Sequence, residues 1–277
     1  MIDSNRHRQQ VEEAVEFLRS RTTVPPEIVI ILGTGLSSLA KSLAAPLSIP
    51  CNDIPHFPVS TVSSHEGNLV FGQSGGKSVA ILQGRVHCYE GYSAREVGFP
   101  LRVLSLLGAH TAIITNASGG LNPNFAPGSI MVLTDHINLL GDNPLRGPNI
   151  DEWGPRFPDL SRPYDKGLVK TALQTAQDLG MDMIQTGTYV CIPGPSLETP
   201  AETRFLRKSG ADAVGMSSIP EIIVAIHANM RVLGLSVVAN VNDPNNLQPI
   251  LLDDIIQTAA KTEPILQELI SEIIKRC

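Results

Sequence analysis

The chain alternates short apolar runs, rich in β-branched side chains, with longer segments in which apolar residues recur at helical spacing. The apolar runs predict β-strands over 27–32, 77–84, 111–116, 129–140, 186–192, 211–216 and 232–240. The amphipathic segments predict helices near 6–20, 93–107, 165–179, 200–209, 219–229 and 252–276, and Pro264 is expected to kink or divide the last one. Several predicted strands are apolar throughout, which is typical of strands covered on both faces. The alternation therefore predicts an α/β protein.

Three short sequences mark helix starts. SARE (93–96), TPAE (199–202) and SIPE (218–221) each place a hydroxyl three residues before a glutamate, as a capping box requires. In such a box the hydroxyl and the carboxylate each bind a backbone N–H that the helix leaves unpaired. The last two also carry a proline near the first helical position, and both come directly after a predicted strand.

Composition narrows the class of protein. The 277 residues suit one large α/β domain or two small ones, and no internal repeat or linker divides them. A net charge of −6 argues against a general nucleic-acid binder, and no apolar run is long enough to cross a membrane. The polar N-terminal segment lacks the apolar core of a signal peptide. The cysteines, Cys51, Cys88, Cys191 and Cys277, share no CxxC spacing, so we expect reduced thiols in a cytoplasmic protein without zinc.

Candidate chemistry follows the predicted strands, since ligands of open α/β sheets collect at the carboxyl ends of strands. Small, polar or glycine-rich segments come after six of them: GTGLSS (33–38), RVHCYE (85–90), ASGG (117–120), PGPSLE (193–198), MSS (216–218) and VND (241–243). Each alone is compatible with an ordinary turn. Their joint occurrence predicts one ligand site.

The GTG segment has two functional interpretations and one structural one. It resembles part of a dinucleotide-binding fingerprint, but Ser38 replaces the third glycine and no acidic residue ends a second strand at the usual distance. An NAD-dependent oxidoreductase is therefore a remote alternative. The better interpretation is a small anion loop in which backbone N–H groups and the Thr34 hydroxyl approach a phosphate oxygen. The structural interpretation is a tight strand–helix turn.

The RVHCYE segment is the richest in reactive side chains. The Arg85 guanidinium matches the geometry of a phosphate. His87 adds a second donor, and its imidazole can gain or lose a proton according to the charge of the bound ligand. Tyr89 is a candidate donor to a sugar hydroxyl, and Glu90 is a candidate for holding a neighbouring group in place. The alternative is a surface Arg–Glu pair with the tyrosine in the core.

Four further positions complete the candidate site. Gly119 lets the backbone approach a ligand closely, and Glu198 can accept two N–H groups of a flat heterocycle. Asn240 carries both a donor and an acceptor, so it can bind a carbonyl next to a ring nitrogen. His65 lies in a Ser/Gly-rich loop that could act as a lid. Glu198 as a helix-dipole partner and His65 as a surface residue are the alternatives, and His227 is interpreted as structural.

The assembled motifs resemble those of the trimeric, low-molecular-mass purine nucleoside phosphorylases, from about residue 28 to the C-terminus. They occur in that family's order and spacing: GTGL, HFPVSTVSSHEG, QGRVHCYEGY, ITNASGGL, GDNPLRGPN, PGPSLETPAE and ADAVGMSSIPE. The resemblance implies a single domain over 1–277, with 1–25 as an N-terminal helical extension, built on a mixed, partly barrel-like sheet flanked by helices. It also implies a homotrimer that cleaves purine nucleosides with phosphate, releasing the purine and α-ribose 1-phosphate, without metal or cofactor.

The resemblance assigns a role to each site residue. It implies a phosphate site made of Thr34, His65, Arg85, His87, the Ala117 backbone N–H and Ser217. It implies ribose contacts from Tyr89 and Met216, and purine contacts from Ala117, Gly119, Leu197, Glu198 and Asn240. His87, Glu198 and Asn240 are the implied catalytic residues. Phe157 matches an aromatic residue that reaches into the neighbouring subunit's site. Catalysis is then electrostatic stabilisation and positioning rather than attack by a protein nucleophile.

Two positions depart from the family pattern. Leu197 stands where the family often has an aromatic residue facing the base, and Leu252 stands where a histidine commonly contacts the ribose 5′-hydroxyl. The apolar Leu252 raises a methylthioadenosine phosphorylase as an alternative. That family has aspartate where this chain has Asn240, and an asparagine together with Glu198 suits a 6-oxopurine. The resemblance therefore implies inosine and guanosine as the expected preferred substrates.

Overall fold

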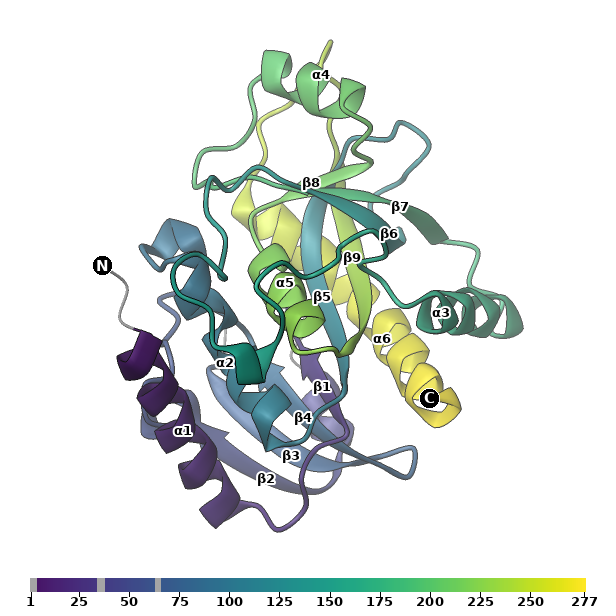
Figure 1. The fold of residues 1–277 in the computed structure, drawn as a ribbon. Coiled ribbons are helices and arrows are strands. Elements are labelled where there is room, and N and C mark those ends of the chain that lie inside the picture. The colour runs from purple at the N-terminus through teal and green to yellow at the C-terminus, as the bar shows by residue number, and fades with distance from the viewer. Residues whose placement is uncertain (1–3, 34–37, 63–65) are drawn as a thin grey trace.

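The computed structural model describes residues 4–33, 38–62 and 66–277, and a nine-stranded mixed sheet runs through it (Figure 1). The strands follow the order β2-β3-β4-β1-β5-β8-β7-β6-β9. Their bounds are β1 Ile28–Ile31, β2 Ala44–Pro50, β3 Asn68–Ser74, β4 Lys77–Gln83, β5 Thr111–Gly120, β6 Ile130–Asn138, β7 Ile184–Cys191, β8 Ala213–Gly215 and β9 Arg231–Val241.

One half of the sheet closes on itself. β9, the last strand in the order, pairs in parallel with β5 along its whole length, from Thr111 opposite Arg231 to Gly120 opposite Val241. The first half of β5 also pairs with β1, and its last two residues pair with β8. Because β5 has these three partners, the strands from β5 to β9 form a ring, which is the partly barrel-like sheet expected from the sequence.

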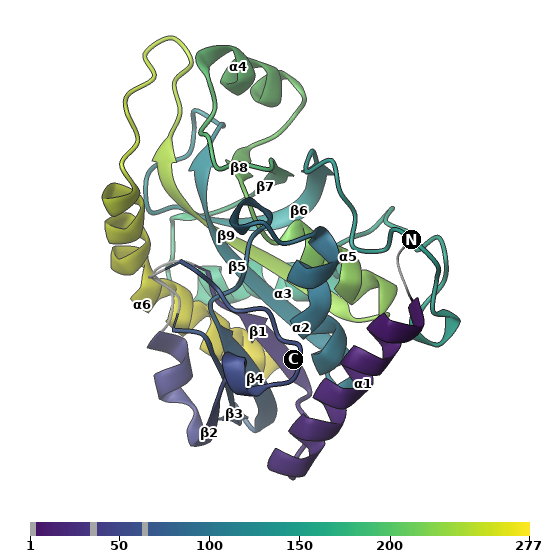
Figure 2. The same cartoon turned by 90° about the vertical axis from the view of Figure 1, so that its left-hand side faces the viewer.

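The described residues form six α-helices, of which five lie against the two sides of the sheet and α4 lies beyond its end near β8 (Figures 1 and 2). Their bounds are α1 Ser4–Arg21, α2 Ala94–Leu107, α3 Lys166–Asp178, α4 Pro200–Lys208, α5 Ile219–His227 and α6 Leu252–Arg276. The helices α1, α2 and α5 contribute to one hydrophobic cluster, and α3 and α6 contribute to another. β1 shows the division clearly, because Val29 and Ile31 belong to the first cluster and Ile28 and Ile30 to the second.

The elements expected from the sequence are all present, with differences at the ends. α6 runs through Pro264 as a single helix, so the expected division is wrong. Two strands were not predicted, β2 and β3. β2 reads AAPLSIP and is mostly exposed, and its prolines are tolerated because it pairs only with β3, at the edge of the sheet. All four cysteines are unpaired thiols. No helix within the described ranges combines the length and apolarity that a bilayer crossing needs.

Two of the three expected capping boxes are confirmed. Ser93 caps α2 and Thr199 caps α4, each with its glutamate bound back to the cap residue. The third is wrong. Ser218 precedes α5 but has a φ of 71° and makes no capping bond with its side chain. Its hydroxyl accepts hydrogen bonds from other elements instead, and Glu221 pairs with Arg85.

Candidate active site

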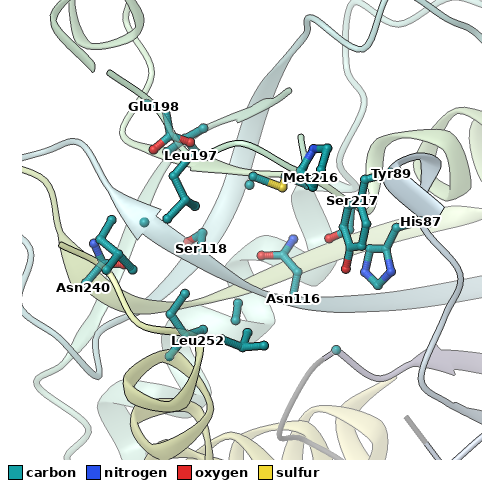
Figure 3. Close-up of a pocket in the computed structure, with 18 of the residues that line it drawn as sticks. His87, Tyr89, Asn116, Ser118, Leu197, Glu198, Met216, Ser217, Asn240 and Leu252 are labelled. Atoms are coloured by element: carbon teal, nitrogen blue, oxygen red, sulfur yellow. The ribbon is translucent and has the colours of Figure 1, made fainter. Parts of the chain in front are cut away.

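A cavity of about 400 Å³ opens where the carboxyl ends of five strands meet (Figure 3). It is lined by residues that follow or end β1, β4, β5, β8 and β9, by the segment after β7, and by the start of α6: Gly33, Arg85, His87, Tyr89, Asn116, Ala117, Ser118, Gly119, Pro195, Leu197, Glu198, Val214, Gly215, Met216, Ser217, Asn240, Asn242, Ile250, Leu252 and Ile255. Gly33 permits this convergence, because a Cβ there would lie 2.8 Å from the Asn116 Cα.

Arg85 is fixed at one end of the cavity by a buried carboxylate. Its Nε lies 3.0 Å from Glu221 Oε1, and both side chains are only 2% exposed. Its Nη1 donates to Ser218 Oγ at 2.9 Å and lies 3.3 Å from Ser217 Oγ. Burial raises the pKa of Glu221, and the Arg85 charge opposes that rise. The guanidinium is therefore held in one orientation by groups on and just before α5.

A polar network continues from Ser218 into the sheet. Asn116 Nδ2 donates to Ser218 Oγ at 2.8 Å, and the Ser236 hydroxyl donates to Asn116 Oδ1 at 2.6 Å. The left-handed backbone of Ser218 brings its hydroxyl between Arg85 and Asn116 rather than toward its own helix. The residues that orient Arg85 are thus themselves hydrogen-bonded, which keeps this end of the cavity rigid.

His87 is oriented by Glu90. The His87 backbone N–H donates to Glu90 Oε1 at 2.8 Å, and His87 Nδ1 lies 2.9 Å from the same oxygen. Glu90 Oε2 accepts from the backbone and the hydroxyl of Thr61 at 2.6 and 2.7 Å. Tyr89 stacks on His87 with ring centroids 4.6 Å apart, and burial raises the pKa of its hydroxyl to about 12. Glu90 therefore holds His87 in place, as expected, and also ties it to the loop around Thr61.

The other end of the cavity carries a carboxylate and two amides. Asn242 Nδ2 donates to Glu198 Oε2 at 3.3 Å, and Asn240 Nδ2 donates to Asn242 Oδ1 at 2.6 Å. Burial raises the pKa of Glu198 above its ordinary value, the nearby Glu202 charge adds to the rise, and the Asn242 bond opposes it. Leu197 and Leu252 lie on opposite sides of the cavity near this end (Figure 3).

The two ends offer different chemistry. A guanidinium, an imidazole and the Ser217 hydroxyl together supply the charged and neutral donors that an oxyanion needs. The carboxylate and amides at the opposite end match the donors and acceptors of a flat nitrogen heterocycle. Figure 3 shows His87, Tyr89 and Ser217 on one side and Glu198 and Asn240 on the other, with Met216 between them.

Most side chains singled out in the sequence line this cavity: Arg85, His87, Tyr89, Ala117, Gly119, Leu197, Glu198, Met216, Ser217 and Asn240. Thr34 and His65 lie outside the described residues. Phe157 does not line the cavity, and its side chain is 86% exposed. His227 is buried away from the cavity, with Nδ1 2.5 Å from Arg102 Nη2. Among the described residues, no group of histidine, cysteine, aspartate or glutamate side chains could hold a metal ion.

Several functional side chains were not predicted. Asn116 ends the predicted strand 111–116 and Asn242 lies two residues after Asn240, so their positions along the sequence were a usable signal, although β5 continues past Asn116 to Gly120. Ser218 and Glu221 were interpreted as a helix cap, and their contacts with Arg85 depend on the tertiary fold. The alternative interpretation of Arg85 as half of a surface Arg–Glu pair is also wrong, because the residue is buried and its carboxylate partner is Glu221 rather than the neighbouring Glu90.

Comparison with known proteins agrees with this arrangement. The model of the phosphorylase superfamily matches residues 27–275. Purine nucleoside phosphorylase 1 of Geobacillus stearothermophilus is 46% identical over 269 residues, covering 97% of this chain and 98% of that protein. A crystal structure of Schistosoma mansoni purine nucleoside phosphorylase with adenosine superposes with a TM-score of 0.92 at 39% identity, covering 97% of both chains. A Schistosoma purine nucleoside phosphorylase with guanosine superposes with a TM-score of 0.90 at 38% identity, covering 97% of this chain and 96% of that one.

Proposed function

Because the chain belongs to the phosphorylase superfamily and, within it, to the purine nucleoside phosphorylases, we propose that it prefers 6-oxopurine nucleosides and converts them with phosphate to the free purine and α-ribose 1-phosphate. The observation that carries the proposal is the division of one cavity into an end with Arg85, His87 and Ser217 and an end with Glu198 and Asn240. The first suits a phosphate, and the second suits the polar edge of a 6-oxopurine.

The proposed mechanism uses no protein nucleophile. Phosphate bound by Arg85, His87 and Ser217 lies beneath the pentose, with Thr34, His65 and the Ala117 N–H as further proposed donors. The bond from C1′ to N9 of the purine breaks as a phosphate oxygen approaches C1′. The electron pair stays on the purine, which takes up a proton at N7, and the hydrogen phosphate supplies that proton through solvent as its oxygen bonds to C1′. Positive charge on the ribose then faces the phosphate, and negative charge on the purine faces the donors of the opposite end.

The remaining cavity residues position the substrate. We assign ribose contacts to Tyr89 and Met216, and base contacts to Leu197, Ala117 and Gly119. Glu198 accepts the N1–H of the base, and Asn240 binds near N7 and O6. The buried pair of Arg85 with Glu221 supports the assignment of Arg85 to phosphate, since an anchored guanidinium needs little reorganisation when phosphate arrives. Inorganic phosphate is a co-substrate here, and the chemistry proposed requires no cofactor.

A second candidate follows from the apolar start of α6. Ile250, Leu252 and Ile255 line the cavity, and none of them can bind a hydroxyl through its side chain. A nucleoside with an apolar 5′ group, such as methylthioadenosine, would fit such a wall better than a free 5′-hydroxyl. Asn240 favours the first candidate, because aspartate suits a 6-amino group better than asparagine does.

The decisive test is a substrate panel. Inosine, guanosine, adenosine and methylthioadenosine are incubated with the enzyme, with and without phosphate, and release of free base is measured. We expect release from inosine and guanosine that requires phosphate and exceeds release from adenosine. Preference for methylthioadenosine would replace the first candidate by the second. Base release that does not need phosphate would contradict both.

The assembly is also a proposal. We infer a homotrimer in which Phe157 of one subunit enters the site of its neighbour. An aromatic side chain that is 86% exposed supports the existence of a partner surface, since large aromatic groups are usually covered. A cytoplasmic location remains a prediction from the four unpaired cysteines.

Glu198 gives the base-binding end a pH dependence. The ionised carboxylate accepts an N1–H more strongly than the protonated acid does, and the pKa of Glu198 is raised above the ordinary 4.5. We therefore expect affinity for hypoxanthine, measured calorimetrically without phosphate, to fall as the pH decreases through a value above 4.5. Glu198→Gln should lower the affinity about ten- to a hundredfold and remove this dependence.

Glu202→Gln provides the matched control. Its amide can still complete the capping box at Thr199, but the charge that helps raise the Glu198 pKa is gone. The pH at which affinity falls should therefore decrease in this variant, whereas affinity at neutral pH should not change. An unaltered pH dependence in Glu198→Gln would remove this residue from the base-binding end.

A further inference from the structure

Three polar side chains form a chain of hydrogen bonds at the base-binding end. Asn240 Nδ2 donates to Asn242 Oδ1 at 2.6 Å, and Asn242 Nδ2 donates to Glu198 Oε2 at 3.3 Å. Asn242 is the middle member and is only 2% exposed. It joins two residues that the proposed function assigns to the base, although it comes after β9 has ended.

The backbone of Asn242 is held on both sides. Its N–H donates to the Gly120 carbonyl at the end of β5 at 2.8 Å, and its carbonyl accepts from Arg207 of α4 at 2.9 Å. The side chain also fills its space closely, because a Cβ at Gly119 would lie 3.2 Å from Asn242 Nδ2. The position of Asn242 is therefore fixed by its backbone hydrogen bonds and its close packing.

The acceptors in this chain determine its direction. A carboxylate can only accept hydrogen bonds, so the Asn242 amide must turn its nitrogen toward Glu198. The Asn242 oxygen then faces Asn240. Asn240 must place its amide nitrogen there as the donor, since two amide oxygens at 2.6 Å would repel each other. The orientation of the Asn240 amide, which is normally ambiguous, is thus fixed by the charge on Glu198 through Asn242.

We infer that Asn242 is a specificity-determining residue, which orients the Asn240 amide so that the site accepts a 6-oxopurine and disfavours a 6-aminopurine. This inference rests on the proposed function, in which Asn240 binds at N7 and O6 and Glu198 at N1. The C6 substituent then lies between those two residues, on the side where Asn242 joins them. The Asn240 nitrogen is turned toward that side and its oxygen toward N7.

This orientation suits one class of purine. The second N–H of Asn240 donates to O6, and its oxygen accepts the proton that N7 gains as the base departs. A 6-amino group would meet an N–H donor at the same place, and the asparagine could not turn over without losing its bond to Asn242. Without Asn242 the amide is free to rotate, and either class of base finds a complementary partner.

The test compares kcat/KM for inosine and adenosine in the wild-type enzyme and in Asn242→Leu, which has a similar volume but neither amide group. We expect the inosine-to-adenosine ratio to fall about tenfold, the loss associated with one hydrogen bond, while KM for phosphate stays unchanged. Dissociation constants for hypoxanthine and adenine should change by the same ratio. If leucine prevents folding, Asn242→Ser removes the amide with a smaller polar side chain.

Asn122→Leu is the matched control, since Asn122 Nδ2 donates to Asp212 Oδ1 at 2.9 Å outside the cavity. It should leave the ratio within about twofold of the wild-type value, as expected for a change that touches no substrate. An unchanged ratio in Asn242→Leu, or equal losses for both nucleosides, would overturn the role of Asn242. Absence of phosphorolysis in the wild-type enzyme would instead overturn the proposed function, so the two failures are distinguishable.

Discussion

Arg85→Met is expected to lower kcat/KM for phosphate by about a hundred- to a thousandfold, the loss typical when one preorganised charge-stabilising donor is removed. The physical reason is that Arg85 lines the cavity and its guanidinium is already held in one orientation by Glu221 and Ser218. Kinetics at varied phosphate and fixed inosine would measure the loss. KM for phosphate should rise and turnover should fall.

The same variant should also lose stability, and a second variant separates the two effects. Arg85→Met leaves the Glu221 carboxylate buried without its counter-charge, which costs about 3–5 kcal/mol. Adding Glu221→Gln removes that uncompensated charge, so the double variant should recover much of the thermal stability but none of the activity. Recovery of both would mean that Arg85 acts on the fold and not on phosphate. Normal phosphate kinetics in the folded single variant would contradict the assigned phosphate site.

The local patterns of apolar and polar residues predicted most of the helices and strands, because these patterns reflect which side chains are buried. β1 is buried on both faces, and its uninterrupted apolar sequence predicted this. β2 escaped prediction because it lies at an edge, where polar residues and prolines satisfy the same hydrogen-bonding rules as in a loop. The closure between β5 and β9 joins segments that are distant along the chain, so it was implied only by resemblance to a family.

The site was predictable to the extent that strand ends determine it. Arg85, His87 and Glu198 come after predicted strands and Asn240 ends one, and the structure brings all four to one cavity. What holds them was harder to predict, because the supporting contacts are made across the fold. SIPE reads as a capping box, yet the φ of Ser218 turns its hydroxyl toward Arg85.

Asn240→Asp is expected to reverse the base preference. A carboxylate cannot donate to O6, but it can accept both from a 6-amino group and from N7–H, so the kcat/KM ratio should move toward adenosine. Losing a hydrogen bond and facing O6 with a charge should together lower kcat/KM for inosine about a hundredfold. Rates with inosine and adenosine, each at saturating phosphate, would measure the change. An unaltered ratio would show that Asn240 does not contact the base at N7 and O6.

The single change should nevertheless give a poor adenosine enzyme, because it places carboxylates at both ends of Asn242. That amide can donate its nitrogen to only one of them, and its oxygen must then face the other. Adding Glu198→Gln reverses the whole chain of bonds. Asn242 then donates to the new carboxylate at position 240, and the new amide at position 198 donates to Asn242 while its second N–H meets N1 of adenine.

We expect the double variant to exceed Asn240→Asp in kcat/KM for adenosine by about tenfold, the contribution of one restored hydrogen bond, and to remain poor with inosine. That gain would come from two contacts of the amide at position 198, the direct one to N1 of adenine and the one coupled through Asn242. A double variant that folds but is no better with adenosine than the single one would refute that coupling.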